Sequence, residues 1–166
     1  MFPLHPNTPK DGLTLEQLFA GRSVDIKAAQ ERLAELMAEE GLPFGQRTMT
    51  YNSRLAQELA KWAETQDGGA AIHDAMYRAY FIDGLNIARI ENLIAVVRQL
   101  GLSEADAREV LVSRKFQTAV DADWQRCQNL GVTAVPTFVV GNNTLVGAQP
   151  YEVLELLVVK GGAVKR

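Results

Sequence analysis

The fold is best indicated by the segment Gly131-Val132-Thr133-Ala134-Val135-Pro136-Thr137-Phe138-Val139-Val140. This segment joins a predicted helix to a predicted strand through a proline. Before it, apolar residues from Phe116 to Leu130 recur at spacings of four, four, three and three, which predicts a helix that Gly131 ends. Pro136 stands at the first residue of a β-rich run, where its missing N–H costs no ladder hydrogen bond. By base rates an X–Pro bond is cis in only about 5–6% of cases, so the residues alone favour a trans bond.

A hairpin and a final helix are predicted after this segment. Gly141-Asn142-Asn143 is typical of a tight turn, and Thr144-Leu145-Val146 returns as a second strand. Pro150 is expected at the first position of the last helix. Because two strands alone make a marginal sheet, the hairpin is expected to belong to a larger one.

Most of the preceding chain is predicted to be helical. The first dozen residues hold three prolines and a glycine, which favours an extended or turning segment. Apolar periodicity then predicts helices over residues 26–37, 51–63, 72–80 and 90–100, with a shorter one after the capping residue Ser103.

Composition narrows the class of protein. The 166 residues are 47% hydrophobic and 22% charged, as expected for one globular domain or a small domain with an insertion. The net charge of -3 argues against a nucleic-acid partner. No apolar run approaches the roughly 18 residues of a membrane helix, and the start lacks a signal-peptide pattern. We therefore expect a cytoplasmic protein with no membrane partner.

The sequence contains few residues that could carry chemistry. Cys127 is its one cysteine, which excludes an internal disulfide, a CxxC pair and a cysteine-based zinc site. It falls on the apolar stripe of its predicted helix, so we expect a buried core residue rather than a nucleophile. His5 and His73 lie far apart and outside any metal-ligand spacing. No catalytic residue, metal site or cofactor is expected among these residues.

Several motifs, in the same order, resemble the DsbA family of thioredoxin-like proteins. Gly131–Val140 is similar to the family's Gly-Val-x-x-Val-Pro-Thr-Phe segment. Phe2–Pro9 resembles the segment that leaves the second strand in those proteins, Asn52–Ala56 resembles a helix start, and Ala75–Gly84 resembles a Tyr-Phe-containing helix. The turn Gly147–Pro150 resembles the FrnE-like branch.

The resemblance implies an α/β, thioredoxin-like fold of DsbA type that is mostly helical, with a large helical insertion. Residues 1–12 would end the N-terminal thioredoxin-like strand segment, 13–113 would form the insertion, and 114–166 the C-terminal thioredoxin-like half. Family proteins place a strand and a CxxC-bearing helix before the point where this chain begins. The N-terminal βα unit is therefore expected to be incomplete here.

The resemblance also implies a site. Val135-Pro136 matches the family's cis-proline loop, which faces the CxxC, so these two residues are expected to bind a thiol or peptide substrate. Three functions remain open: a thiol–disulfide oxidoreductase that is inactive in dithiol exchange as given, a non-catalytic peptide- or partner-binding module, and a glutathione-dependent isomerase of the 2-hydroxychromene-2-carboxylate type. The upstream serine or cysteine that would separate them lies outside this sequence.

A homodimer is expected as well. A thioredoxin-like sheet without its first strand leaves the Pro136–Val140 strand with an unpaired edge, which invites pairing with a second chain. A symmetric dimer could cover that edge in both copies, with the hairpin and Phe2–Leu4 near the interface.

Overall fold

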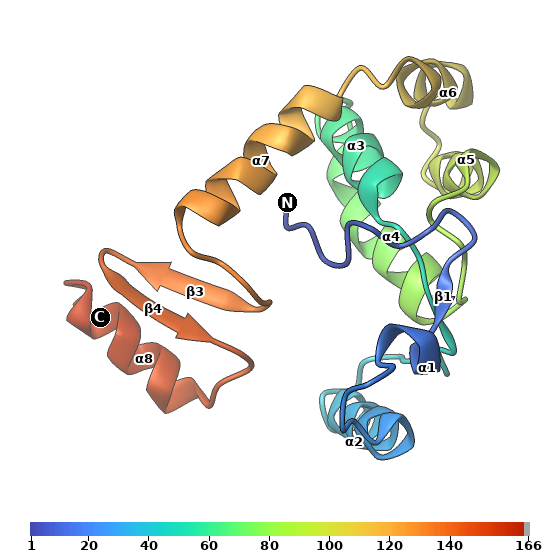
Figure 1. Ribbon diagram of the computed structural model, residues 1–166. Coiled ribbons are helices and arrows are strands. Elements are labelled where there is room, and N and C mark those ends of the chain that lie inside the picture. Colours follow the sequence, from blue (N-terminus) through green and yellow to red (C-terminus); the bar gives the residue numbers. More distant parts are fainter. Residues whose placement is uncertain (165–166) are drawn as a thin grey trace. The chain divides into compact units, whose positions relative to one another are not determined.

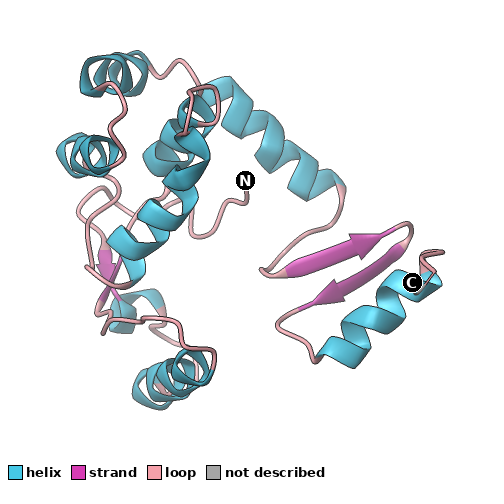
Figure 2. Ribbon diagram, turned by 180° about the vertical axis from the view of Figure 1, so that it is seen from behind, coloured by secondary structure: helices cyan, strands magenta, loops and turns pink. Residues whose placement is uncertain are grey.

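The computed structural model describes residues 1–164 and divides into two compact units. The first, which we call the helical unit, contains Met1 and Pro3–Asp121; the second, the hairpin unit, contains Phe2 and the chain from Ala122 onward. The division predicted from the sequence, at residues 12/13 and 113/114, stays a prediction. Each unit is described by itself below (Figures 1 and 2).

The helical unit is made of short helices and one small pair of strands. Strands β1 and β2 pair antiparallel, with Leu13 opposite Thr50. Thr14 caps α1 through a capping box with Gln17, and Asp25 caps α2. The bounds are β1 Leu13–Thr14, α1 Leu15–Leu18, α2 Ile26–Glu39, β2 Met49–Thr50, α3 Arg54–Ala63, the 3-10 helix η1 Gly69–Ala71, α4 Ile72–Phe81, α5 Ile90–Gln99 and α6 Glu104–Ser113. Helix α7, Gln117–Asn129, begins in this unit and ends in the next.

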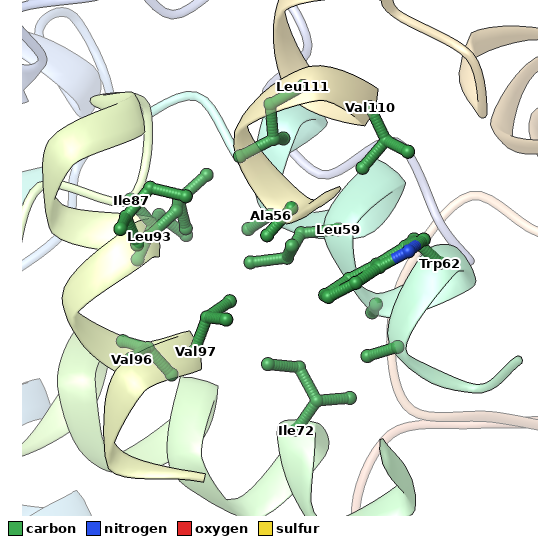
Figure 3. Packing of buried hydrophobic residues seen from close by; sticks show 14 of the residues in the cluster. Ala56, Leu59, Trp62, Ile72, Ile87, Leu93, Val96, Val97, Val110 and Leu111 are labelled. Atoms are coloured by element: carbon green, nitrogen blue, oxygen red, sulfur yellow. The ribbon is translucent and has the colours of Figure 1, made fainter. Parts of the chain in front are cut away.

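The core of the helical unit is formed by α3, α4, α5 and α6. Figure 3 shows Leu59 and Trp62 of α3, Ile72 of α4 and Val97 of α5 around one apolar interior. Val110 and Leu111 of α6 complete it. These helices match the predicted ones because each buries one stripe of its apolar residues.

Helix α2 forms where its apolar periodicity predicts a helix, but no residue of α2 is buried. Leu33 and Leu36 are exposed. The periodicity of a helix specifies which residues share a face, but it does not specify what covers that face.

The hairpin unit contains the end of α7, strands β3 (Thr137–Val140) and β4 (Asn143–Val146), and helix α8 (Tyr151–Lys160). The strands pair antiparallel with Phe138 opposite Leu145, which confirms the predicted hairpin. Pro150 is the N-cap of α8 rather than its first helical residue. Gly161 at the other end of α8 lies against Val140, so this face of the hairpin is turned to the helix.

The predicted elements and the described ones agree in type. Helices predominate, and β3 and β4 form the longest strand pair among residues 1–164. None of the described helices is long and apolar enough to cross a membrane.

Candidate substrate-binding loop

The candidate site is the loop that joins α7 to β3. Gly131, with a φ of 66°, ends α7, and the N–H of Val132 donates to the carbonyl of Cys127 at 2.9 Å. At the far end, Thr137 Oγ1 donates to the carbonyl of Ala134 at 2.6 Å. Hydrogen bonds therefore fix the loop where it leaves α7 and where it enters β3.

Val135 and Pro136 lie at the centre of this loop, and the peptide bond between them is cis. The carbonyl of Pro136 accepts the N–H of Gly147 at 2.8 Å, which continues the pairing of β3 with β4 by one more bond. Pro136 is thereby tied to the hairpin.

The main-chain groups of Val135 are unpaired in the described part of the chain. Val135 is 49% exposed, and no group among residues 1–164 hydrogen-bonds its N–H or its carbonyl. Both groups must therefore be satisfied by water or by a bound molecule. An extended peptide supplies the matching donors and acceptors along its main chain.

The outer edge of β3 is also open. Among the described strands β3 hydrogen-bonds β4 alone, so its second edge presents main-chain groups without a strand partner. Val139 and Val146 are both exposed. Val135 leads directly into this edge, so an extended chain bound at Val135 could continue along β3.

Cys127 does not occupy the position that the sequence predicted. It lies in the last turn of α7 and is half-buried rather than fully buried. Leu130, on the same predicted apolar stripe, is 50% exposed. The prediction of full burial was wrong, because helical spacing specifies which residues share a face but not how far that face is covered.

The position of Cys127 in its helix bears on its reactivity. Cys127 stands at the C-terminal end of its helix, whereas catalytic thiols are activated at helix N-termini or beside cations. Within residues 1–164 no group of three His, Cys, Asp or Glu side chains is placed to hold a metal ion. The geometry of the loop therefore supports binding through main-chain groups.

Comparison with known proteins gives a family match over nearly the whole chain. A family model described as DSBA-like thioredoxin domain matches residues 1–158. The uncharacterized protein YwbO of Bacillus subtilis is 28% identical over 102 residues, which is 61% of this chain and 51% of that protein. This match therefore spans about half the length of the relative.

Two solved structures share the fold. A 2-hydroxychromene-2-carboxylate isomerase superposes with a TM-score of 0.68 at 21% identity, over 91% of this chain and 70% of the isomerase. The cytosolic disulfide reductase DsbM from Pseudomonas aeruginosa, solved with GSH, superposes with a TM-score of 0.56 at 25% identity, over 90% of this chain and 80% of DsbM. These likenesses confirm the fold class predicted from the sequence.

Proposed function

Because this chain belongs to the DSBA-like thioredoxin domain family, we propose that it holds a thiol- or disulfide-bearing peptide at Val135 and Pro136, as the substrate-binding part of a thiol–disulfide oxidoreductase. The observation that carries this proposal is that Val135 is an exposed residue whose N–H and carbonyl make no hydrogen bond within residues 1–164. A peptide in extended conformation can pair with that backbone through main-chain hydrogen bonds. Glutathione is itself a peptide thiol, and DsbM is described in complex with it.

We propose that Val135 and Pro136 bind the substrate, and that this chain alone does not catalyse its thiol–disulfide exchange. Dithiol exchange needs an attacking thiol and a second thiol that resolves the mixed disulfide. The sequence contains one cysteine, and Cys127 lies in the last turn of α7. Reduction of insulin by this chain is therefore expected to stay at background.

Oxidised glutathione is the probe for this site. We expect it to bind, and we expect Val135→Pro to weaken binding about tenfold, because the variant removes one N–H donor. The matched control is Val135→Ala, which shortens the side chain but keeps both main-chain groups, and it should bind like the parent chain. Isothermal titration calorimetry measures the affinities, and circular dichroism verifies that each variant is folded. Equal affinities for the proline variant and the parent chain would contradict the proposal.

A glutathione-dependent isomerase is the second candidate function. It is favoured by the fold match with the 2-hydroxychromene-2-carboxylate isomerase, which covers 91% of this chain. The two candidate functions are distinguished by following the ultraviolet absorbance of 2-hydroxychromene-2-carboxylate in the presence of this chain and glutathione. Glutathione-dependent isomerisation would replace the first proposal by the second.

The proposal also includes the branch of the family and the cellular location. The Gly147-Ala148-Gln149 turn before α8 supports the FrnE-like branch, because Gly147 has a φ of 90° and the amide of Gln149 donates back to the carbonyl of Val146. A cytoplasmic location is supported by the use of a single cysteine and by the description of DsbM as cytosolic.

We also propose that the chain forms a homodimer through the open edge of β3. Strands β3 and β4 contain no charged residue, so two copies could approach without electrostatic repulsion and without the edge lysine that commonly prevents such pairing. A twofold axis beside β3 would let both copies pair their free main-chain groups.

Substitution of Val139 by lysine tests this dimer. Sedimentation equilibrium at micromolar concentration is expected to show a dimer for the parent chain and a monomer for Val139→Lys, because the lysine places a charge on the exposed strand surface. Asn142→Lys adds the same charge at the hairpin turn, away from the edge, and should stay dimeric. A monomeric parent chain would refute the dimer.

A further inference from the structure

Two cavities of the helical unit differ in chemistry. The first lies between α3, α4 and the N-terminal segment, and its wall is mostly apolar and aromatic. The second, which we call the basic pocket, is open to solvent and has a volume of about 300 Å³. The basic pocket is lined by Lys10, Asn52, Arg54, Leu55, Ala88 and Arg114. All six residues belong to the helical unit, and three of them are cations, so the pocket favours a negatively charged ligand.

The backbone of Lys10 is held at the basic pocket by hydrogen bonds. Asn52 Nδ2 donates to the carbonyls of Pro6 at 2.9 Å and Thr8 at 3.0 Å, which fixes the N-terminal segment beside the start of α3. Asn86 Nδ2 donates to the carbonyl of Lys10 itself at 3.0 Å. Lys10 is therefore positioned by its main chain, and its side chain takes no part in that contact.

The two arginines of the basic pocket are oriented by Glu58. The Glu58 side chain is 1% exposed and accepts from Arg114 Nε at 2.8 Å, from Arg114 Nη2 at 2.6 Å and from Arg54 Nε at 3.3 Å. Arg54 also pairs with Asp121. The two carboxylates balance the charges of the two arginines, so the charge of Lys10 is left in excess at the pocket.

Hydrogen-bond donors remain free on two of the three cations. Arg114 donates to Glu58 through Nε and Nη2, and its Nη1 makes no hydrogen bond within residues 1–164. The Lys10 ammonium makes neither an ion pair nor a hydrogen bond in the same part of the chain. The N–H of Leu55, in the first turn of α3, has no acceptor among these residues either. An anion in the pocket would supply acceptors to these donors.

We propose that the basic pocket binds a phosphate monoester of a small molecule. A carboxylate is recognised side-on by the paired Nε and Nη2 groups of an arginine, and those of Arg114 are already occupied by Glu58. The donors that remain, Arg114 Nη1 and the Lys10 ammonium, are separate from each other and suit an anion with three acceptor oxygens. The pocket volume also admits a small organic group beside Leu55. This proposal goes beyond the peptide-binding function and does not depend on it.

Glycerol 3-phosphate and glycerate are the probes, because both are small hydroxylated molecules and they differ in the anionic group. Isothermal titration calorimetry on the full chain at pH 8 and constant ionic strength keeps the phosphate doubly charged. We expect glycerol 3-phosphate to bind about tenfold more tightly than glycerate, because the phosphate engages one more charge-assisted hydrogen bond. Inorganic phosphate, which lacks the organic group, is expected to bind more weakly than glycerol 3-phosphate.

Substitution of Lys10 tests the location. Lys10→Met should weaken binding of glycerol 3-phosphate about tenfold, because it removes one charge-assisted hydrogen bond and leaves the pairs of Glu58 in place. The matched control is Lys27→Met on α2, which removes the same charge from an exposed lysine that pairs with Glu31 at 3.8 Å outside the pocket. This control should bind like the parent chain, and circular dichroism verifies that both variants are folded.

The amide of Leu55 gives a second readout of the location. Its ¹H–¹⁵N resonance should shift during titration with glycerol 3-phosphate, whereas the amide of Ala38 on α2 should stay in place. Absence of binding, equal affinity for glycerate, or inorganic phosphate that binds at least as tightly as the ester would overturn the proposal. Equal effects of the Lys10 and Lys27 substitutions, or an unshifted Leu55 resonance at saturation, would overturn it too.

Discussion

Replacement of Glu58 by alanine is expected to lower the free energy of unfolding of the helical unit by about 3–5 kcal/mol. The Glu58 side chain on α3 is 1% exposed. It accepts hydrogen bonds from Arg114 Nε at 2.8 Å, from Arg114 Nη2 at 2.6 Å and from Arg54 Nε at 3.3 Å. Its removal would leave the partly buried guanidinium of Arg114 without its carboxylate, while Arg54 keeps its pair with Asp121, and the charge of Arg114 cannot be fully hydrated in place.

Glu91→Ala is the matched control. Glu91 makes an equally complete pair with Arg108, at 2.6 and 2.7 Å, but its side chain is 75% exposed. Water can replace the lost partner there, so stability should stay close to that of the parent chain. Urea unfolding followed by Trp62 fluorescence in a Trp124→Phe background reports on the helical unit, because Trp62 is buried in its core. Similar losses for both variants would show that burial does not determine the contribution of Glu58.

Replacement of Leu59 by alanine is expected to cost about 2–5 kcal/mol in the same measurement. Leu59 is fully buried at the centre of the cluster shown in Figure 3. Its truncation removes apolar contacts from α3 and leaves a cavity that the surrounding helices can fill only in part.

Leu36→Ala makes the same chemical change on α2, where the side chain is 48% exposed. It should alter stability by well under half of the Leu59 effect, since little apolar surface is lost from the interior. A larger effect at Leu36 than at Leu59 would show that the apolar stripe of α2 is covered in solution.

The sequence predicts the helices of the core well, because each of them follows a period that buries one stripe of apolar residues. It does not predict β1 and β2, because two residues per strand are too few for a periodic pattern. Helical spacing also does not show which apolar residues are covered. Leu36 and Leu130 repeat at helical spacing, yet both are about half exposed.

The site is predictable only in part. Val135 and Pro136 are found through their resemblance to a family segment, and their chemistry comes from main-chain groups that no residue type reveals. The cavity between α3, α4 and the N-terminal segment has no sequence signal, because His5, Tyr51 and Tyr80, which line it, lie at distant positions in the chain. Burial of Glu58 is equally hidden, since a glutamate in a helix ordinarily faces water.

Binding of an extended peptide thiol or disulfide by the backbone of Val135 is tested by a ¹H–¹⁵N correlation spectrum of the full chain, recorded during titration with oxidised glutathione. We expect the Val135 amide resonance to shift and saturate, because its N–H exchanges water for a carbonyl of the ligand. The amide of Ala70, on the η1 helix of the helical unit, should stay in place. An unchanged Val135 resonance at saturating glutathione would show that its backbone does not bind the peptide.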